Sequence, residues 1–153
     1  MAATHVSYEA DGWGVGELWL DGDRLLQHEL PRAAVAGRGS GHELADRFRL
    51  WFAGEADDFL DVALDLEGAT EFELALTEAL RAVPRGEVVT YGELAALAGR
   101  PRAQRAAGTF CARNRFSLVV PCHRVVGADG IGSYGSLGID YKRRLLELEG
   151  VAV

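Results

Sequence analysis

The chain has 153 residues, of which 48% are hydrophobic and 25% are charged, and its formal net charge at pH 7 is −7. This length suffices for a buried core in one domain or in two small ones. No apolar run approaches the roughly 18 residues of a membrane span, and residues 1–11 lack the basic start and apolar stretch of a secretory signal, so we expect a cytoplasmic protein.

The charge is unevenly distributed along the chain. Residues 1–80 carry a net charge of −12, residues 81–125 carry +6 and residues 126–153 carry −1. The basic side chains of the middle segment are all arginines. This segment is either a solvated arginine face or a surface that binds an anion such as a nucleic acid backbone, and charge alone does not separate the two.

The first part of the chain begins with strand-like runs at residues 16–20 and 25–30. Asp21-Gly22-Asp23 lies between them and is typical of a hairpin turn. Glycine-rich residues 31–41 indicate a loop.

An amphipathic helix is predicted at residues 42–53 and a further strand at residues 61–66. Residues 1–68 are therefore expected to form a small acidic α+β domain. His5, His28 and His42 are interpreted as solvated surface residues, and no structural zinc is expected because this part has no cysteine.

Residues 69–153 are expected to form a mainly helical domain. Two capping boxes, each a threonine followed three residues later by a glutamate, predict helices that begin after Thr70 and Thr90. The first of these helices is expected to end at Pro84 and the second at Gly99.

A third helix is predicted from Pro101 to about Arg113. A short helix, a tight corner and a longer helix resemble a helix-turn-helix, whose second helix enters a DNA groove. Arg102, Arg105 and Arg113 on that helix suit phosphates, and its small residues permit close approach to another surface. On these residues alone, tight packing against a neighbouring helix remains the equal alternative.

Cys122 and His123 carry the strongest chemical signal. They follow residues 118–120, which are predicted to form a buried strand, and Pro121. A nearby imidazole and a positive field both favour the reactive thiolate, although a Cys-His pair alone also fits a structural cysteine. Cys111 is interpreted as a packed thiol. Both thiols are expected to be free, and neither belongs to a CxxC pair or a histidine-rich tract that would indicate a metal site.

The context of Cys122 resembles the O6-alkylguanine-DNA alkyltransferase family, also called the methylated-DNA–protein-cysteine methyltransferases. The resemblance covers about residues 69–153. Its motifs stand in the family's order: PRGEVVTYGELA at 84–95, RAAG at 105–108, Asn114, PCHRVV at 121–126, and Lys142 followed by LLELEG at 145–150.

The resemblance implies DNA repair by a single, stoichiometric transfer of an alkyl group from O6 of guanine to Cys122. His123 would deprotonate the thiol, Glu149 would orient His123, Tyr91 would donate a proton or hydrogen bond to the departing guanine, and Asn114 would hold the turn around the thiol. The implied fold is a small sheet with a helix, followed by a helical domain with a helix-turn-helix and a short wing. No dissociable cofactor and no metal would be needed.

The resemblance also implies a partner, double-stranded DNA containing O6-alkylguanine, bound by a monomer that rotates the damaged nucleotide into a pocket. Arg105 would fill the vacated place in the base stack. The residues implied to contact DNA are Thr90, Arg102, Arg105, Arg113 and Arg124, and those implied to form the pocket are Val125, Ser133, Tyr134, Gly135 and Ser136.

Two departures from the family's pattern stand out. Arg115 follows Asn114 where the family usually has proline, and Ser136 and Leu137 follow Gly135 where the family usually has two glycines soon after the loop tyrosine. Bulk at that second place is expected to narrow the pocket for large alkyl groups.

Three other functions are alternatives to alkyl transfer. A lesion-recognition protein without transfer would resemble this chain but would replace the reactive cysteine, so Cys122 is the discriminating residue. A helix-turn-helix regulator would need an effector domain, and none is visible in the sequence. A cysteine hydrolase would need an acyl-transfer motif, and none is recognised.

Overall fold

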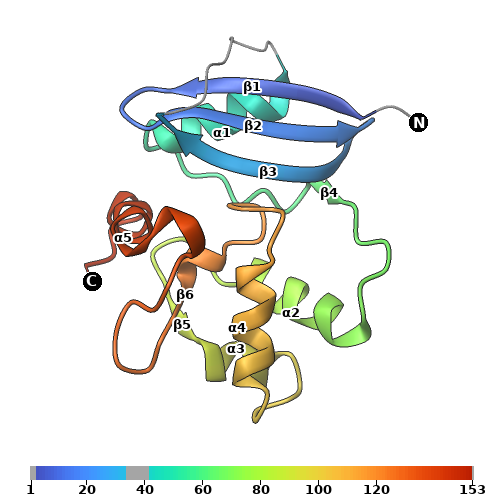
Figure 1. The fold of residues 1–153 in the computed structure, drawn as a ribbon, viewed down its shortest axis with the longest axis vertical. Helices are drawn as coiled ribbons and strands as arrows, with labels where there is room; N and C mark the ends of the chain where they lie inside the picture. The colour runs from blue at the N-terminus through green and yellow to red at the C-terminus, as the bar shows by residue number, and fades with distance from the viewer. Residues whose placement is uncertain (1–2, 34–41, 153) are drawn as a thin grey trace. The chain divides into compact units, whose positions relative to one another are not determined.

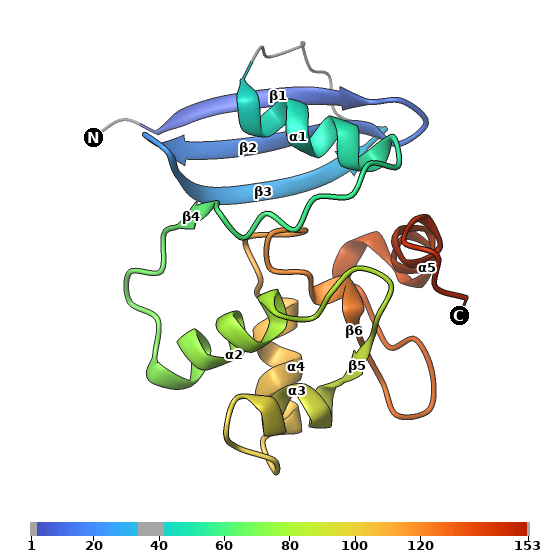
Figure 2. The same cartoon turned by 180° about the vertical axis from the view of Figure 1, so that it is seen from behind.

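The computed structural model describes residues 3–33 and 42–152, and the chain divides into two compact units (Figures 1 and 2). The first unit comprises Met1–Asp65 and Arg115–Ser117, and the second comprises Leu66–Asn114 and Leu118–Val153. The predicted boundary between residues 68 and 69 lies close to this division. The sequence did not suggest that Arg115–Ser117 would return to the first unit.

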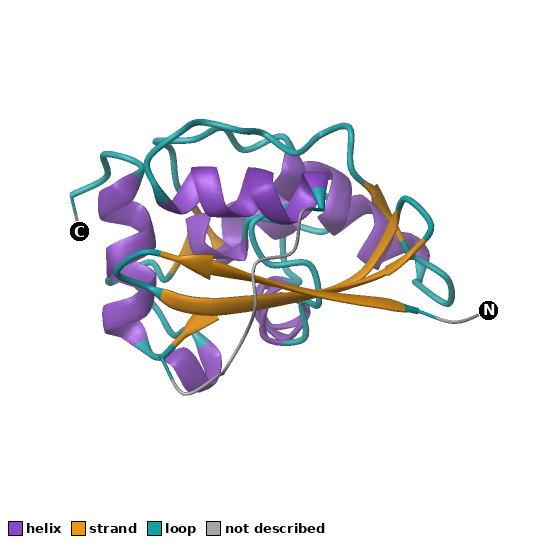
Figure 3. Cartoon of the chain, turned by 90° about the horizontal axis from the view of Figure 1, so that it is seen from above, coloured by secondary structure: helices purple, strands orange, loops and turns teal. Residues whose placement is uncertain are grey.

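Three long antiparallel strands dominate the first unit. β1 (Thr4–Ala10), β2 (Gly14–Asp21) and β3 (Arg24–Arg32) pair in this order, and their twist is visible in Figure 3. The predicted turn between β2 and β3 is confirmed. The strand predicted at residues 61–66 is only the short β4 (Ala63–Leu64), which pairs in parallel with β3. Part of the loop predicted at residues 31–41 lies outside the described residues.

Helix α1 (Glu43–Phe52) covers one face of this sheet (Figure 2) and confirms the helix predicted at residues 42–53. Its Phe48 and Phe52 stack with Tyr8 of β1, with ring centroids 5.8 and 6.5 Å apart. The Tyr8 ring lies so close to β2 that a Cβ atom at Gly16 would approach it to 2.3 Å. Glycine at position 16 is therefore what lets an aromatic ring lie flat on the strand.

The three histidines of the first unit have different environments. His5 is exposed and its Nε2 lies 2.8 Å from Glu17 Oε2, while His42 Nδ1 accepts a hydrogen bond from the Leu44 amide and caps α1. His28 is only 2% exposed, so its interpretation as a surface residue is wrong. Burial lowers the pKa of His28 to about 4, and the imidazole is therefore neutral at neutral pH.

The second unit contains four helices among its described residues, α2 (Glu71–Arg81), α3 (Tyr91–Leu97), α4 (Gln104–Ala112) and α5 (Ile139–Leu148). Both predicted capping boxes are present, at Thr70 and Thr90. The helix predicted from Pro101 begins only at Gln104, because a hydrogen bond from the Ala103 amide to the Arg100 carbonyl closes a separate turn before it. Arg102 therefore lies in the corner between α3 and α4.

The segment around Cys122 has little regular structure. Residues 118–120 are buried as predicted but form no strand, since Leu118 has a φ of +73° and the residues after it turn. The segment is followed by β6 (Val125–Val126), which pairs in parallel with β5 (Val89–Thr90) in a short two-stranded sheet. The chain after β6 folds back through an isolated antiparallel bridge between Gly127 and Gly130. This bridge stands where the short wing was predicted.

The predicted α+β class, a small sheet with a helix followed by a mainly helical unit, is confirmed. Among the described residues, no helix has the length and apolarity needed to cross a membrane.

Candidate active site

Cys122 begins a short 3-10 turn, Cys122–Arg124, and is only 7% exposed. Asn114, two residues beyond the end of α4, donates from Nδ2 to the Val120 carbonyl at 2.7 Å and also hydrogen-bonds the thiol. Tyr134 Oη lies 4.0 Å from Cys122 Sγ. Polar groups from the chain before and after Cys122 therefore contact the thiol.

Burial raises the pKa of the Cys122 thiol above its usual value. Hydrogen bonding with Asn114 and Tyr134 and the charge of Lys142 oppose this rise without cancelling it. The predicted positive field is therefore present, but it lowers the pKa of the thiol by less than desolvation raises it. The resting sulfur consequently carries its proton. Any nucleophilic chemistry at this sulfur needs a base.

His123 and Glu149 form a buried pair, with His123 Nε2 3.0 Å from Glu149 Oε1. Burial lowers the pKa of His123, although the neighbouring carboxylate acts in the opposite direction, so the imidazole is neutral and able to accept a proton. Burial alone would raise the pKa of Glu149, but hydrogen bonds from His123 and Arg124 bring it down to about 2. A neutral base beside a fixed negative charge is suited to brief protonation.

Arg124 does not have the environment predicted for a DNA contact. Its guanidinium is buried, donates from Nε and Nη2 to the Glu149 carboxylate, and donates from Nη1 to the Val83 carbonyl at 2.7 Å. The Arg124 guanidinium is buried and bonded to groups of the protein itself. The prediction of Arg124 as a DNA-binding residue is therefore wrong.

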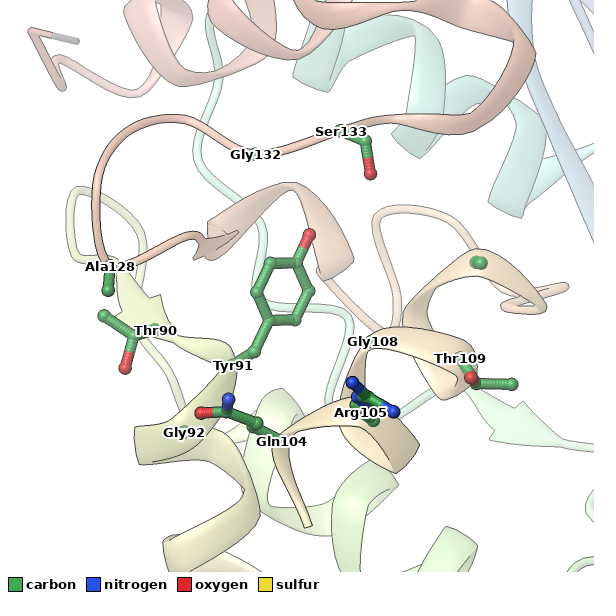
Figure 4. A pocket seen from close by; sticks show the side chains of 11 residues that line it. Thr90, Tyr91, Gly92, Gln104, Arg105, Gly108, Thr109, Ala128, Gly132 and Ser133 are labelled. Atoms are coloured by element: carbon green, nitrogen blue, oxygen red, sulfur yellow. The ribbon is translucent and has the colours of Figure 1, made fainter. Parts of the chain in front are cut away.

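A cavity of about 740 Å³ opens in the second unit between the start of α3, α4 and the loop after β6 (Figure 4). Four of the predicted site residues are among those lining it: Thr90, Tyr91, Arg105 and Ser133. The other lining residues are Gly92, Gln104, Gly108, Thr109, Ala112, Ala128 and Gly132. Of these, Ala128 and Gly132 belong to the loop of residues 127–138 that the family resemblance implies as one wall of the pocket, and the other five were not assigned to a pocket from the sequence.

The Tyr91 side chain crosses this cavity toward residues 132 and 133 (Figure 4) and hydrogen-bonds Ser133. Burial raises the pKa of its hydroxyl, helped by the nearby thiols of Cys111 and Cys122. Tyr91 therefore keeps its proton at neutral pH and can donate it to a group bound in the cavity.

The remaining predicted pocket residues do not line this cavity. Val125 is fully buried in β6, Tyr134 lies against the thiol, and Gly135 and Ser136 lie in a second 3-10 turn, Gly135–Leu137. Burial of Val125 rules out direct contact between its side chain and a bound base in this structure.

The exposed arginines have the freedom that DNA binding requires. Arg105 is exposed on α4 and lines the cavity, Arg102 is exposed in the corner between α3 and α4, and Arg113 is exposed at the end of α4.

Thr90 is half-buried, and its side chain caps α3. Cys111 is a partly buried free thiol whose pKa burial raises to about 12, in keeping with its interpretation as a packed thiol.

Lys142 has a structural role that its sequence motif did not reveal. It is fully buried and donates from Nζ to the Val125 carbonyl at 2.5 Å and to the Ser133 carbonyl at 3.3 Å. It thereby ties the loop after β6 to α5. A signal existed in the sequence, because Lys142 precedes the apolar Leu145 and Leu146 by three and four residues and so shares their buried helix face.

Comparisons with known sequences find similar proteins. Residues 71–151 match the family model described as 6-O-methylguanine DNA methyltransferase, DNA binding domain. The methylated-DNA–protein-cysteine methyltransferase of Methanosarcina acetivorans is 44% identical over 123 residues, which cover 80% of this chain and 77% of that protein. The protein of the same name from Mycobacterium tuberculosis is 48% identical over 105 residues, 68% of this chain but only 62% of that protein.

Solved structures give the same picture. The crystal structure of Mycobacterium tuberculosis O6-methylguanine methyltransferase has a TM-score of 0.82 at 33% identity, covering 97% of this chain and 93% of that one. A structure of the Mycobacterium tuberculosis protein in complex with DNA has a TM-score of 0.80 at 34% identity, covering 95% of this chain and 92% of that one.

Proposed function

This chain belongs to the methylated-DNA–protein-cysteine methyltransferase family and repairs DNA by direct reversal of alkylation, and we propose that Cys122 is its alkyl acceptor. The observation that supports this choice is the setting of the thiol. Cys122 is hydrogen-bonded by Asn114 and Tyr134, and the next residue is a neutral imidazole paired with an ionised carboxylate. Cys111 lacks such a setting.

The proposed reaction is one displacement in which two protons move. The Cys122 thiol gives its proton to His123 through a water, and Glu149 stabilises the imidazolium that forms. The sulfur attacks the alkyl carbon, the bond between that carbon and guanine O6 breaks, and the electron pair remains on the base. Tyr91 donates its proton to the departing guanine. The thioether is stable, so each molecule reacts once.

The proposed substrate is O6-alkylguanine in double-stranded DNA. The reacting atom is inaccessible in the duplex, so the nucleotide must be rotated out of the duplex and bound in the cavity that Tyr91 lines. Arg105, exposed on α4 and bordering the same cavity, is proposed to take the vacated place in the stack. Arg102 and Arg113 are proposed to contact phosphates. We propose that Gly135 and Ser136 shape the entry for larger alkyl groups.

The free thiols of Cys111 and Cys122 fit the reducing cytoplasm, which we propose as the site of action, and we propose that the protein acts as a monomer.

Intact-mass and peptide mass spectrometry after incubation with a duplex containing one O6-methylguanine test this function. The expected result is a gain of one methyl group on the peptide that holds Cys122. Cys122→Ser should gain nothing, whereas the matched variant Cys111→Ser should be methylated like the unmodified chain. Tight binding of the lesion without any mass change would instead indicate a recognition protein that transfers nothing.

A further inference from the structure

The segment Arg115–Ser117, which lies between α4 and Cys122 in sequence, is bound by β3 of the first unit. The His28 amide donates to the Arg115 carbonyl at 2.8 Å, and His28 Nδ1 donates to the Ser117 carbonyl at 2.7 Å. Phe116, between them, forms a parallel bridge with His28 and is buried. One residue of β3 therefore holds both ends of a three-residue segment.

The His28 side chain is itself rigidly placed. Because Nδ1 donates to Ser117, Nε2 must accept, and the Tyr8 hydroxyl donates to it at 2.6 Å. The imidazole also stacks on Phe48, with the ring centroids 3.8 Å apart and the planes 2° apart. A neutral ring with both nitrogens engaged and one face covered has one orientation, so it fixes the position of the Ser117 carbonyl.

Arg115 adds a second attachment from the segment's own side. Its Nη1 donates to the Leu26 carbonyl and its Nη2 donates to the Asp65 carbonyl, each at 3.1 Å. The guanidinium also lies 4.9 Å from the centre of the Phe116 ring. The family usually has proline at this position, and its ring fixes φ but offers no hydrogen-bond donor. In this chain, the hydrogen bonds of the Arg115 side chain replace the restraint of the proline ring.

We propose that His28 and Arg115 are positioning residues for alkyl transfer: by fixing Arg115–Ser117 they fix the backbone that carries Asn114, and through Asn114 the geometry of the Cys122 thiol. The link is covalent and short. Asn114 immediately precedes the held segment, its Nδ2 donates to Val120 at 2.7 Å, and its side chain also hydrogen-bonds the thiol. This role rests on the proposed function of Cys122 and extends it to the N-terminal sheet.

The test compares Arg115→Ala and His28→Phe with Arg47→Ala. Arg47 belongs to the same unit and makes four side-chain hydrogen bonds, to Asp57 and Asp61, but none of them reaches residues 115–117. Two properties are measured on each variant. One is the single-turnover rate of methyl transfer at saturating duplex, with duplex affinity measured separately. The other is the pH midpoint of Cys122 alkylation by iodoacetamide without DNA.

If the proposal holds, Arg115→Ala and His28→Phe slow transfer by roughly fivefold, the factor that corresponds to one lost hydrogen bond, while duplex affinity is maintained. The alkylation midpoint of Cys122 moves to higher pH in both variants, and Arg47→Ala changes neither property. Asn114→Ala combined with Arg115→Ala should be no slower than Asn114→Ala alone, because both changes act through one side chain.

Unchanged rates and midpoints in both variants, with only a lower melting temperature, would overturn the proposal and leave His28 and Arg115 as purely structural residues. Arg115 is exposed, so its variant is expected to fold even if His28→Phe does not. If the unmodified chain transfers no methyl group, the proposed function fails. The iodoacetamide midpoint then still decides whether the segment positions the thiol.

Discussion

Arg124 and Glu149 form a buried, two-pronged ion pair in which Arg124 Nε lies 3.0 Å from Oε1 and Nη2 lies 2.5 Å from Oε2. The same Oε1 lies 3.0 Å from His123 Nε2. A carboxylate held by a planar guanidinium in this way cannot rotate, so it presents one oxygen to the imidazole in a fixed direction. Arg124 therefore acts on the site through Glu149.

Arg124→Ala should destabilise the fold without weakening DNA binding directly. Removing one partner of a buried ion pair leaves the other charge uncompensated, and the expected loss in the free energy of unfolding is about 3–5 kcal/mol, measured by urea denaturation. In the fraction that remains folded, the dependence of DNA affinity on salt should be unchanged.

Arg102→Ala provides the matched comparison, because Arg102 is exposed. That variant should keep its stability and reduce the slope of log affinity against log salt by about one. If Arg124→Ala reduced the slope in the same way, Arg124 would have to reach DNA after all.

Acidification should destabilise the protein well before its carboxylates titrate. Burial lowers the pKa of His28 from 6.5 to about 4, so between these two pH values the unfolded chain binds a proton at His28 and the folded chain does not. The contribution of neutral His28 to the free energy of unfolding is therefore complete above pH 6.5 and is lost as the pH falls toward 4. The loss amounts to about 2 kcal/mol by pH 5. Urea unfolding from pH 7.5 to pH 5 measures this loss.

The His28→Phe variant identifies the source of this loss. Burial also lowers the pKa of His123, which therefore contributes in the same direction. The free energy of unfolding of the variant should still depend on pH, but less steeply. Glu149, with a pKa of about 2, loses its contribution only below its ordinary pKa of 4.5, outside the measured range. A variant with the same slope as the unmodified chain would show that His28 does not titrate as its burial requires.

Local signals in the sequence were sufficient for most of the helices. A capping box involves residues three apart, so Thr70 and Thr90 mark helix starts whatever the rest of the chain does. The alkyl-acceptor motif around Cys122 was recognisable for a similar reason, since its residues are contiguous. The start of α4 was misplaced because Pro101 suits a first helical turn and a non-helical corner equally well.

Residues whose environment depends on distant partners could not be predicted. His28 is buried because residue 117, 89 positions away, returns to β3, and no local pattern encodes that return. Arg124 looked like a surface charge because its partner Glu149 belongs to another element, 25 residues further on. Charge counts along a chain do not distinguish a buried pair from a solvated face.

Tyr91→Phe should slow methyl transfer and leave lesion binding unaffected. The variant keeps the ring that crosses the cavity but removes the hydroxyl proposed to protonate the departing guanine, and loss of a general acid costs on the order of a hundredfold. Tyr141→Phe is the control, because Tyr141 is also largely buried but does not line the cavity. Single-turnover kinetics at saturating duplex distinguish the two. Equal rates for Tyr91→Phe and the unmodified chain would exclude the proposed proton donation.

Gly132→Ala should disturb the cavity through the backbone. Gly132 has a φ of +81°, which costs a residue with a Cβ about 1–2 kcal/mol, and that Cβ would lie 3.2 Å from Tyr91 Oη and 3.4 Å from Lys142 Nζ. Both side chains fix the wall formed by Ser133, so the added methyl should displace Tyr91 and slow transfer more than it lowers the melting temperature. Gly130→Ala, in the same loop, has no atom within 4 Å of the added carbon and no positive φ, and should resemble the unmodified chain in rate and stability. If both variants slowed transfer equally, loop flexibility in general, and not the contact with Tyr91 and Lys142, would explain the need for glycine.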